Sequence, residues 1–252
     1  MSAVLSAREL PGVWPAHALA TPSVAAQSTG FAALDAELPG GGWPEAGLVE
    51  LLLPAQASQR WLVLLPALAA RLRQHSGPLV LIGAPALLGP QSPALVPFSP
   101  ALAAQGLPAH RLLCVNATTP AQRLWACEQA LRCADTVAVV AWLPQREGAQ
   151  QASALRRLHV GAVDYGKPVF VLRSAQAQQA SSPAPLRLEV VANPVGIDGL
   201  QVRILKRRGP PLRSPLALPS PLPRLDALLR VRQGPARGEE KAHVLAGALS
   251  AA

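Results

Sequence analysis

The sequence predicts an α/β fold with a mostly parallel sheet, an antiparallel edge and helices on both faces. From Gly47 onward, short apolar runs alternate with longer stretches of helical periodicity, a pattern typical of parallel sheets covered on both sides. Two later runs are joined by ANPVGIDG, in which Asp198-Gly199 is a turn signal. With 252 residues, half of them hydrophobic, the chain can build one sizeable core with flanking segments.

The expected elements follow this alternation along the chain. Regular alternation begins only after Gly30, so residues 1–27 are expected to form an N-terminal arm. The expected strands are residues 48–53, 79–82, 111–115, 136–142 and 168–172, and the expected helices are residues 58–74, 119–133 and 150–160. The antiparallel pair is expected at residues 186–191 and 200–206. This order indicates a doubly wound domain.

The segment after Arg208 reads RGPPLRSPLALPSPLPRL, which is too rich in proline for a strand or a helix. We therefore expect residues 209–252 to be a flexible, proline-rich tail that follows a core domain of residues 28–208. No uninterrupted apolar run reaches the length of a membrane span, and the first residues lack the pattern of a secretory signal. A cytoplasmic protein with no membrane partner is expected.

Charge and cysteine usage say little about function. The formal net charge of +9 permits attraction to nucleic acid, but the chain is rich in Ala, Leu, Arg and Pro, so charge alone is weak evidence for such a partner. Cys114, Cys127 and Cys133 are odd in number and have no CxxC spacing. We interpret them as core thiols and expect neither a disulfide framework nor a zinc site.

The chain resembles the core of RecA from Ser28 onward. The segment STGFAALDAELPGGGWPEAGLVELLLP has the Ser-Thr-Gly start, the Leu-Asp pair, the glycine-rich turn and the first strand of that core. LIGAPALLGP and the later strand VAVVAWL follow in the same order and at similar spacing. The resemblance covers residues 28–208 and implies a RecA-like, doubly wound fold.

Among RecA relatives, the chain looks most like the ImuA family of accessory proteins in mutagenic translesion synthesis. This similarity lies in LDAELPGGGWP, in the helix WACEQALR and in the late segment VRILKRRG. The close competitor is the SulA family of cell-division inhibitors, which bind FtsZ. SulA-like chains are usually shorter and lack a proline-rich extension.

The resemblance implies a phosphate-binding loop between the first strand and the first long helix. Such a loop needs glycines so that backbone N–H groups can surround the phosphates, a lysine for the β- and γ-phosphates, and a hydroxyl for Mg²⁺. Here there is no glycine, Gln59 stands where the lysine belongs and Arg60 where the hydroxyl belongs. We expect a degenerate loop and no cofactor. Its residues are Pro54, Ala55, Gln56, Ala57, Ser58, Gln59 and Arg60.

Hydrolysis would also need carboxylates, and residues 51–127 contain no Asp or Glu. Gly83-Ala84-Pro85 stands where RecA-like enzymes have the activating glutamate, and Val140-Ala141-Trp142 where they have the metal-supporting aspartate. The histidines outside the arm lie far apart and have no acidic neighbours three or four residues later. We therefore expect no catalytic residue, no metal site and no enzymatic activity.

Other features are interpreted as architectural or as contacts. The turn that ends in Trp43-Pro44 is expected to anchor against the core, and Trp125 is expected to be a packing residue. Arg156 and Arg157 are assigned no site. The candidate contacts to DNA or to a partner are Arg203, Lys206, Arg207 and Arg208, with a solvated strand end as the alternative.

The resemblance implies a non-catalytic adaptor in SOS-induced mutagenic translesion DNA synthesis. Its expected partners are an ImuB-like inactive relative of Y-family polymerases and, through it, an error-prone DNA polymerase and the sliding clamp. A direct contact with DNA and homo-oligomerisation are left open. The alternatives are a SulA-like inhibitor that binds FtsZ and an ATP-dependent RecA-type recombinase.

Overall fold

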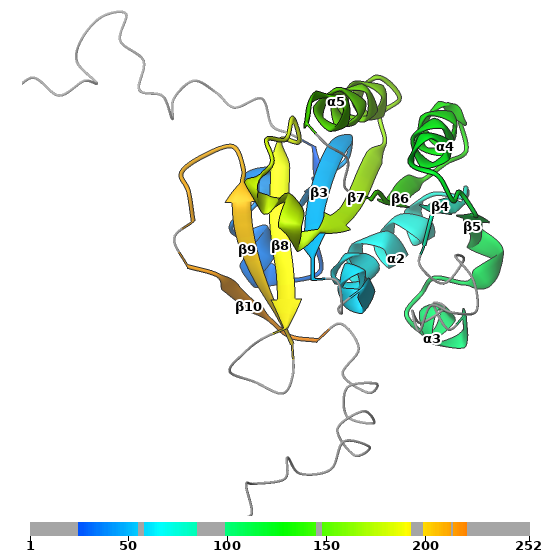
Figure 1. The fold of residues 1–252 in the computed structure, drawn as a ribbon. Helices are drawn as coiled ribbons and strands as arrows, with labels where there is room; N and C mark the ends of the chain where they lie inside the picture. The colour runs from blue at the N-terminus through cyan, green and yellow to red at the C-terminus, as the bar shows by residue number, and fades with distance from the viewer. Residues whose placement is uncertain are drawn as a thin grey trace, which may run out of the picture. The chain divides into compact units, whose positions relative to one another are not determined.

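The computed structural model describes residues 25–54, 58–84, 99–144, 148–192, 199–212 and 214–220. Its centre is an eight-stranded sheet in the order β10-β9-β8-β3-β7-β6-β4-β5 (Figure 1). The strands from β8 to β5 run parallel, and β9 is antiparallel to both of its neighbours. The strands are β3 (Gly47–Leu53), β4 (Leu79–Ile82), β5 (Leu112–Val115), β6 (Ala138–Trp142), β7 (Pro168–Ser174), β8 (Leu186–Ala192), β9 (Leu200–Lys206) and β10 (Leu216–Leu218). The predicted mostly parallel sheet with an antiparallel edge is confirmed.

Helices cover both faces of the sheet. α4 (Pro120–Arg132) and α5 (Gly148–Asp164) lie on one side of β7, β6 and β4 in Figure 1, and α2 (Leu65–Gln74) lies on the other. Because side chains alternate along a strand, Val169 packs with α4 and α5 while the next residue, Phe170, points to the opposite face. There Trp43 meets Phe170 edge-on, with 5.8 Å between the ring centroids. The two faces of β7 thus contribute to two hydrophobic layers.

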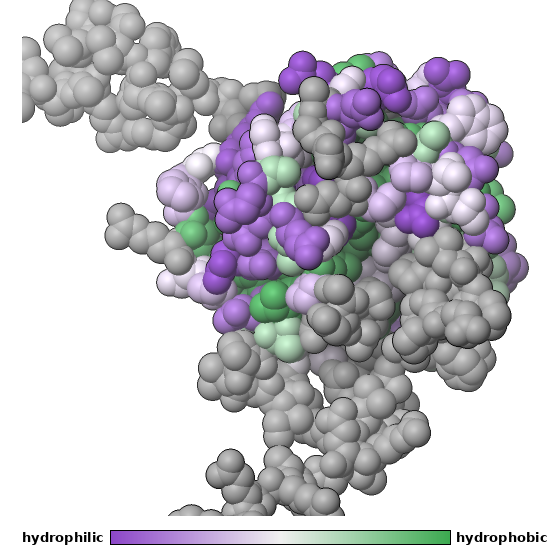
Figure 2. Space-filling view, viewed as in Figure 1, coloured by the Kyte–Doolittle hydropathy of each residue, from purple (hydrophilic) through white to green (hydrophobic). Residues whose placement is uncertain are grey.

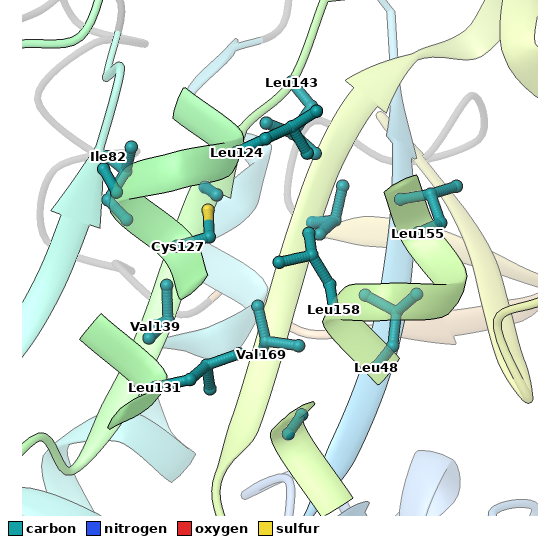
Figure 3. Close-up of a cluster of buried hydrophobic side chains, with 14 of the residues drawn as sticks. Leu48, Ile82, Leu124, Cys127, Leu131, Val139, Leu143, Leu155, Leu158 and Val169 are labelled. Carbon is teal, nitrogen blue, oxygen red and sulfur yellow. The ribbon is translucent and has the colours of Figure 1, made fainter. Parts of the chain in front are cut away.

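The layer under α4 and α5 is built from aliphatic side chains. Figure 3 shows Leu155 and Leu158 of α5 beside Leu48 of β3, and Cys127 of α4 near Val139 of β6. Leu48, Cys127, Val139, Leu155 and Leu158 are completely shielded from solvent. Burial raises the pKa of the Cys127 thiol to about 12, so this side chain acts as a small hydrophobic residue.

The single helix expected at residues 58–74 is divided in the structure. Ser58–Leu64 form a 3-10 helix (η2), and the α-helix begins only at Leu65. Pro66 lies in the first turn of α2. Backbone N–H groups in the first turn have no acceptor within the helix, so the missing N–H of proline costs no hydrogen bond there. A proline within the helical pattern therefore marks the start of α2.

α4 begins where the sequence predicts it. Thr119 is its N-cap: the Thr119 hydroxyl accepts a hydrogen bond from the Gln122 amide at 3.2 Å, and the Gln122 side chain accepts one from the Thr119 amide at 3.1 Å. This reciprocal arrangement, with Pro120 in the first turn, satisfies two amide donors that would otherwise have no partner in the helix. The short helices α1 (Ala32–Asp35) and α3 (Ser99–Ala104) were not predicted.

Three short strands were also missed. β10 lies within the proline-rich segment where we expected no strand, and it pairs with β9 at the edge of the sheet. That expectation is wrong for these three residues, although the last described residue is Ser220 and the rest of the predicted tail lies outside the described part. β1 (Ala26–Gln27) pairs with β2 (Trp43–Pro44), and the Gln27 side chain donates to the Ala67 carbonyl at 2.8 Å.

A buried group of three charged side chains joins the middle strands. Glu50 of β3 lies between Arg173 of β7, at 2.5 Å from Oε1 to Nη1, and Arg187 of β8, at 2.7 Å from Oε2 to Nε. The Glu50 and Arg173 side chains are completely buried. Arg187 also donates to the carbonyls of Ala177 and Ala180. Burial removes charges from water at a large cost, so each arginine depends on the carboxylate.

Replacement of Glu50 by Gln should leave two buried guanidinium groups without a counter-charge. We expect the free energy of unfolding, measured by urea denaturation, to fall by about 3–5 kcal/mol. The matched control is Glu189→Gln, which removes an ion pair with Arg203 whose arginine side chain is 54% exposed. That change should cost about 1 kcal/mol or less. Equal losses for the two variants would contradict this account.

Candidate functional site

The six parallel strands end at one edge of the sheet, and open α/β sheets bind ligands outside such carboxyl ends. β4 and β6 are neighbours, but the chain leaves β4 for β5 and leaves β6 for β7, which lie in opposite directions along the sheet. Divergent connections of this kind leave a crevice between the two strand ends. We therefore take the ends of β3, β4 and β6 as the candidate ligand site.

Arg123 lies between the carboxyl ends of β4 and β6. Its side chain comes from the first turns of α4, and its Nε and Nη1 donate to the carbonyls of Ala117, at 2.8 Å, and Trp142, at 2.6 Å. Gly83, just after β4, lies so close that a Cβ there would be 2.5 Å from the Arg123 Nε. Arg123 is only 7% exposed, and burial lowers its pKa. The guanidinium thus lies between the ends of β4 and β6, at the candidate ligand site.

Two tryptophan side chains pack against each other at the carboxyl end of β6. Trp61, in the segment after β3, meets Trp142 at the end of β6 edge-on, with 5.6 Å between the ring centroids. Both rings are buried. In Figure 2, hydrophobic side chains show at the centre of the view, near the ends of β3 and β7 and the start of α2 as drawn in Figure 1. The contact between the rings fixes η2 against the end of β6.

The predicted degenerate loop is described only in part. Pro54 directly follows β3 and is partly exposed, whereas Ala55, Gln56 and Ala57 lie outside the described residues. The backbone of Ser58, Gln59 and Arg60 belongs to η2. The described residues thus show a strand before this position and a 3-10 helix after it. Among the residues that the structure describes, no group of three or more His, Cys, Asp or Glu side chains could hold a metal ion.

The four candidate contacts to DNA or a partner do not act as one group. Arg203 lies in the middle of β9, and the other three lie at or after its end. Because β9 is antiparallel, Lys206, Arg207 and Arg208 are at the amino ends of the parallel strands, away from the candidate ligand site. Arg207 is a structural residue, because it bonds to the Glu37 carboxylate at 2.8 Å and to the Pro210 carbonyl at 2.9 Å.

The other three of these side chains are on the surface. Arg203 forms an ion pair with Glu189 at 3.5 Å, and Lys206 donates to the Ser182 carbonyl at 2.9 Å. Arg208 is exposed, and its positive charge acts on His159 of α5. Arg203, Lys206 and Arg208 therefore keep charge that a partner could reach.

Five basic side chains of the described chain lie inside the protein. Arg123 and Arg187 are examples already described, and Lys167 donates to the carbonyls of Leu131, at 3.1 Å, and Cys133 at the end of α4. Such side chains satisfy backbone acceptors and contribute little to the field outside. The net charge in the sequence therefore overstates the basic character of the surface. The buried basic residues are Arg71, Arg123, Lys167, Arg173 and Arg187.

Two expectations about packing are wrong. Trp125, expected in the core, is 64% exposed, because Leu124 and Cys127 occupy the inner face of α4 and Trp125 points outward from it. Of the three expected core thiols, only Cys127 is buried, whereas Cys114 and Cys133 are exposed. Cys114 lies on the outermost strand β5, which pairs only with β4, and Cys133 caps the end of α4.

Sequence reasoning missed Arg123 and Trp61, two side chains that lie at the candidate ligand site. A signal for Arg123 was present: it precedes Leu124 and lies one turn before Cys127, so it is a basic residue on the apolar face of a predicted helix. Trp61 was treated as one more apolar residue of a helix. Its role depends on the approach of η2 to β6, which local sequence does not specify.

Comparison with known proteins identifies no family for this chain. No family model matches it, and no curated protein matches it. Within the described residues, none of the helices has the length and apolar character needed to cross a membrane.

His159 of α5 bonds to the backbone of β3, and its protonation should make the stability of the fold depend on pH. Its Nδ1 accepts a hydrogen bond from the Leu48 amide at 3.2 Å, which requires the neutral imidazole. Burial lowers the pKa of His159, and the positive charges of Arg208 and Lys206 lower it further. Because the folded pKa lies below the unfolded value of about 6.5, the folded state binds fewer protons in this range.

The free energy of unfolding should therefore fall as the pH is lowered from about 7 through about 6.5 and below, until the folded pKa is passed. His159→Gln should have a shallower slope of unfolding free energy against pH, as measured by urea denaturation. His110→Gln, at an exposed histidine, is the control and should keep the wild-type slope. An unchanged slope in His159→Gln would argue against a titrating His159.

Proposed function

We propose that this protein is a non-catalytic, RecA-like accessory protein of SOS-induced mutagenic translesion DNA synthesis. In this role it joins an ImuB-like inactive relative of Y-family polymerases to an error-prone replicative-type polymerase and the sliding clamp. The pathway rests on the sequence resemblance from Ser28 to residue 208, in particular on the segments LDAELPGGGWP and VRILKRRG.

The observation that best supports a non-catalytic role is the occupied carboxyl edge. Arg123, Trp61 and Trp142 place the protein's own side chains where an α/β sheet would bind a ligand. The loop after β3 has Gln59 in place of a phosphate-binding lysine. Both features disfavour the binding of a nucleoside triphosphate. A binding role on the outer surface is the more economical interpretation.

β5 offers one such surface. It is the outermost strand of the parallel part and bonds only to β4, so one side of its backbone has no strand partner within the described sheet. Leu113 on this strand is 52% exposed. An exposed edge that carries apolar side chains is suited to pairing with an extended segment of another protein. We propose β5 as the edge to which the ImuB-like partner adds.

A null result in nucleotide assays is the first expected outcome. The wild-type chain should neither hydrolyse ATP nor bind a fluorescent ATP analogue. Gln59→Lys should not restore binding, because Arg123 and the tryptophans still occupy the site. Saturable binding of the analogue by the wild-type chain would favour the recombinase alternative.

Capture experiments test the proposed partner. The full chain should retain the ImuB-like protein of its own genome and not FtsZ, whereas retention of FtsZ alone would favour the SulA-like alternative. A truncation after Pro221 is preferable to one after Gly209, because it keeps β10 on the sheet.

Leu113→Lys should weaken capture by at least about tenfold, because a charge on an edge strand opposes strand addition. Arg73→Glu, on the surface of α2, is the control and should bind normally.

A further inference from the structure

Most of the large exposed hydrophobic side chains of the described chain belong to two adjacent helices or directly follow one of them. Apart from Leu113, the large exposed hydrophobic residues within the described chain lie on α4, on α5 or directly after α5. They are Trp125, Val160, Val163 and Tyr165, with exposed fractions of 64%, 51%, 51% and 46%. Single exposed apolar residues are ordinary, but a group on two adjacent helices indicates a surface that binds protein. α5 supplies the centre of this group.

The outer face of α5 carries a ridge with opposite charges at its two ends. Arg156, Val160 and Asp164 are spaced by four residues, so they lie in one row along the helix, and all three are exposed. No described residue forms an ion pair with Arg156 or Asp164. The neighbouring Arg157 is different, because it bonds to Glu128 of α4 at 3.2 Å. The ridge thus has one unpaired charge of each sign around an apolar residue.

We propose that α5 is the interface of a homodimer, with a second copy of this chain packed antiparallel on the ridge. Rows of side chains spaced by four residues interdigitate when two helices cross at about 50°, the commonest class of helix packing. If a two-fold axis passes beside Val160, Arg156 of each copy lies next to Asp164 of the other, and the two Val160 side chains meet. A two-fold interface must be self-complementary. The order arginine, valine, aspartate along this ridge meets that requirement.

The charge pattern specifies the occupant. An antiparallel copy forms two ion pairs at the ends of an apolar contact, whereas a parallel copy would place arginine near arginine and aspartate near aspartate. Val163 extends the apolar area on the side of α5 where Gly47 of β3 lies, since a Cβ on that glycine would be 3.6 Å from Val163. The dimer requires neither a nucleotide nor the translesion partner, so it stands independently of the proposed function.

Charge reversal with rescue tests this interface. Sedimentation velocity of the full chain, over a roughly hundredfold range of concentration, should show a monomer–dimer equilibrium. Arg156→Glu and Asp164→Arg should each weaken dimerisation by at least about tenfold, because each places like charges together at two positions. The double variant should recover dimerisation. Arg73→Glu makes the same change of charge on the opposite layer and should dimerise like the wild type.

A cross-link provides a second measurement. In a chain with Cys114→Ser and Cys133→Ser, Val160→Cys should form an intersubunit disulfide on mild oxidation, because the two copies of this position meet at the axis. Ser153→Cys, two turns earlier on the same exposed face, should not. A wild-type chain that stays monomeric over the whole range, or a dimer that responds to neither charge reversal, would overturn the proposal. Rescue by the double variant is the result that a merely destabilised fold could not produce.

Discussion

The buried ion group of Glu50, Arg173 and Arg187 is the constraint on which the sheet depends. Among the parallel strands, β3 comes first along the chain, and its neighbours β7 and β8 come last. Glu50 bonds to one arginine from each of them. Mispairing by a single residue would turn these arginines to the opposite face, away from the carboxylate. The ion group therefore selects the register in which the middle of the sheet closes.

The same chemistry recurs where the sheet meets its connections. Arg123 bonds to carbonyls after β5 and at the end of β6, Lys167 to those at the end of α4, and Arg71 to the Val137 carbonyl just before β6. Carbonyl groups at the ends of helices and strands have no partner within their own element. Buried long-chain cations supply these bonds here, so part of the basic composition serves the fold and not the surface. This use explains why a chain with a sequence pI near 10.9 need not be a nucleic-acid-binding protein.

The parts of the fold that sequence could predict are those in which one physical signal dominates. β4 is apolar and buried throughout, whereas β9 alternates buried and more exposed side chains, and both have the predicted bounds. The bounds of β3 differ by one residue. β10 could not be predicted, because its three residues gain a partner only when β9 is already in place. Trp125 was misplaced for a related reason: an aromatic residue on a helix indicates burial on average, whereas the packing of α4 on β6 decides which face is inside.

The candidate site shows the same division between local and non-local information. The absence of glycine and lysine after β3 can be read directly, because a phosphate-binding loop is a local structure. The occupation of the site by Arg123 and Trp61 cannot, since these side chains come from two helical segments far apart in the chain. Under the proposed binding role, recognition of a partner needs chemical groups that face outward. The exposed side chains of β5, α4 and α5 meet that condition, and the buried charges do not.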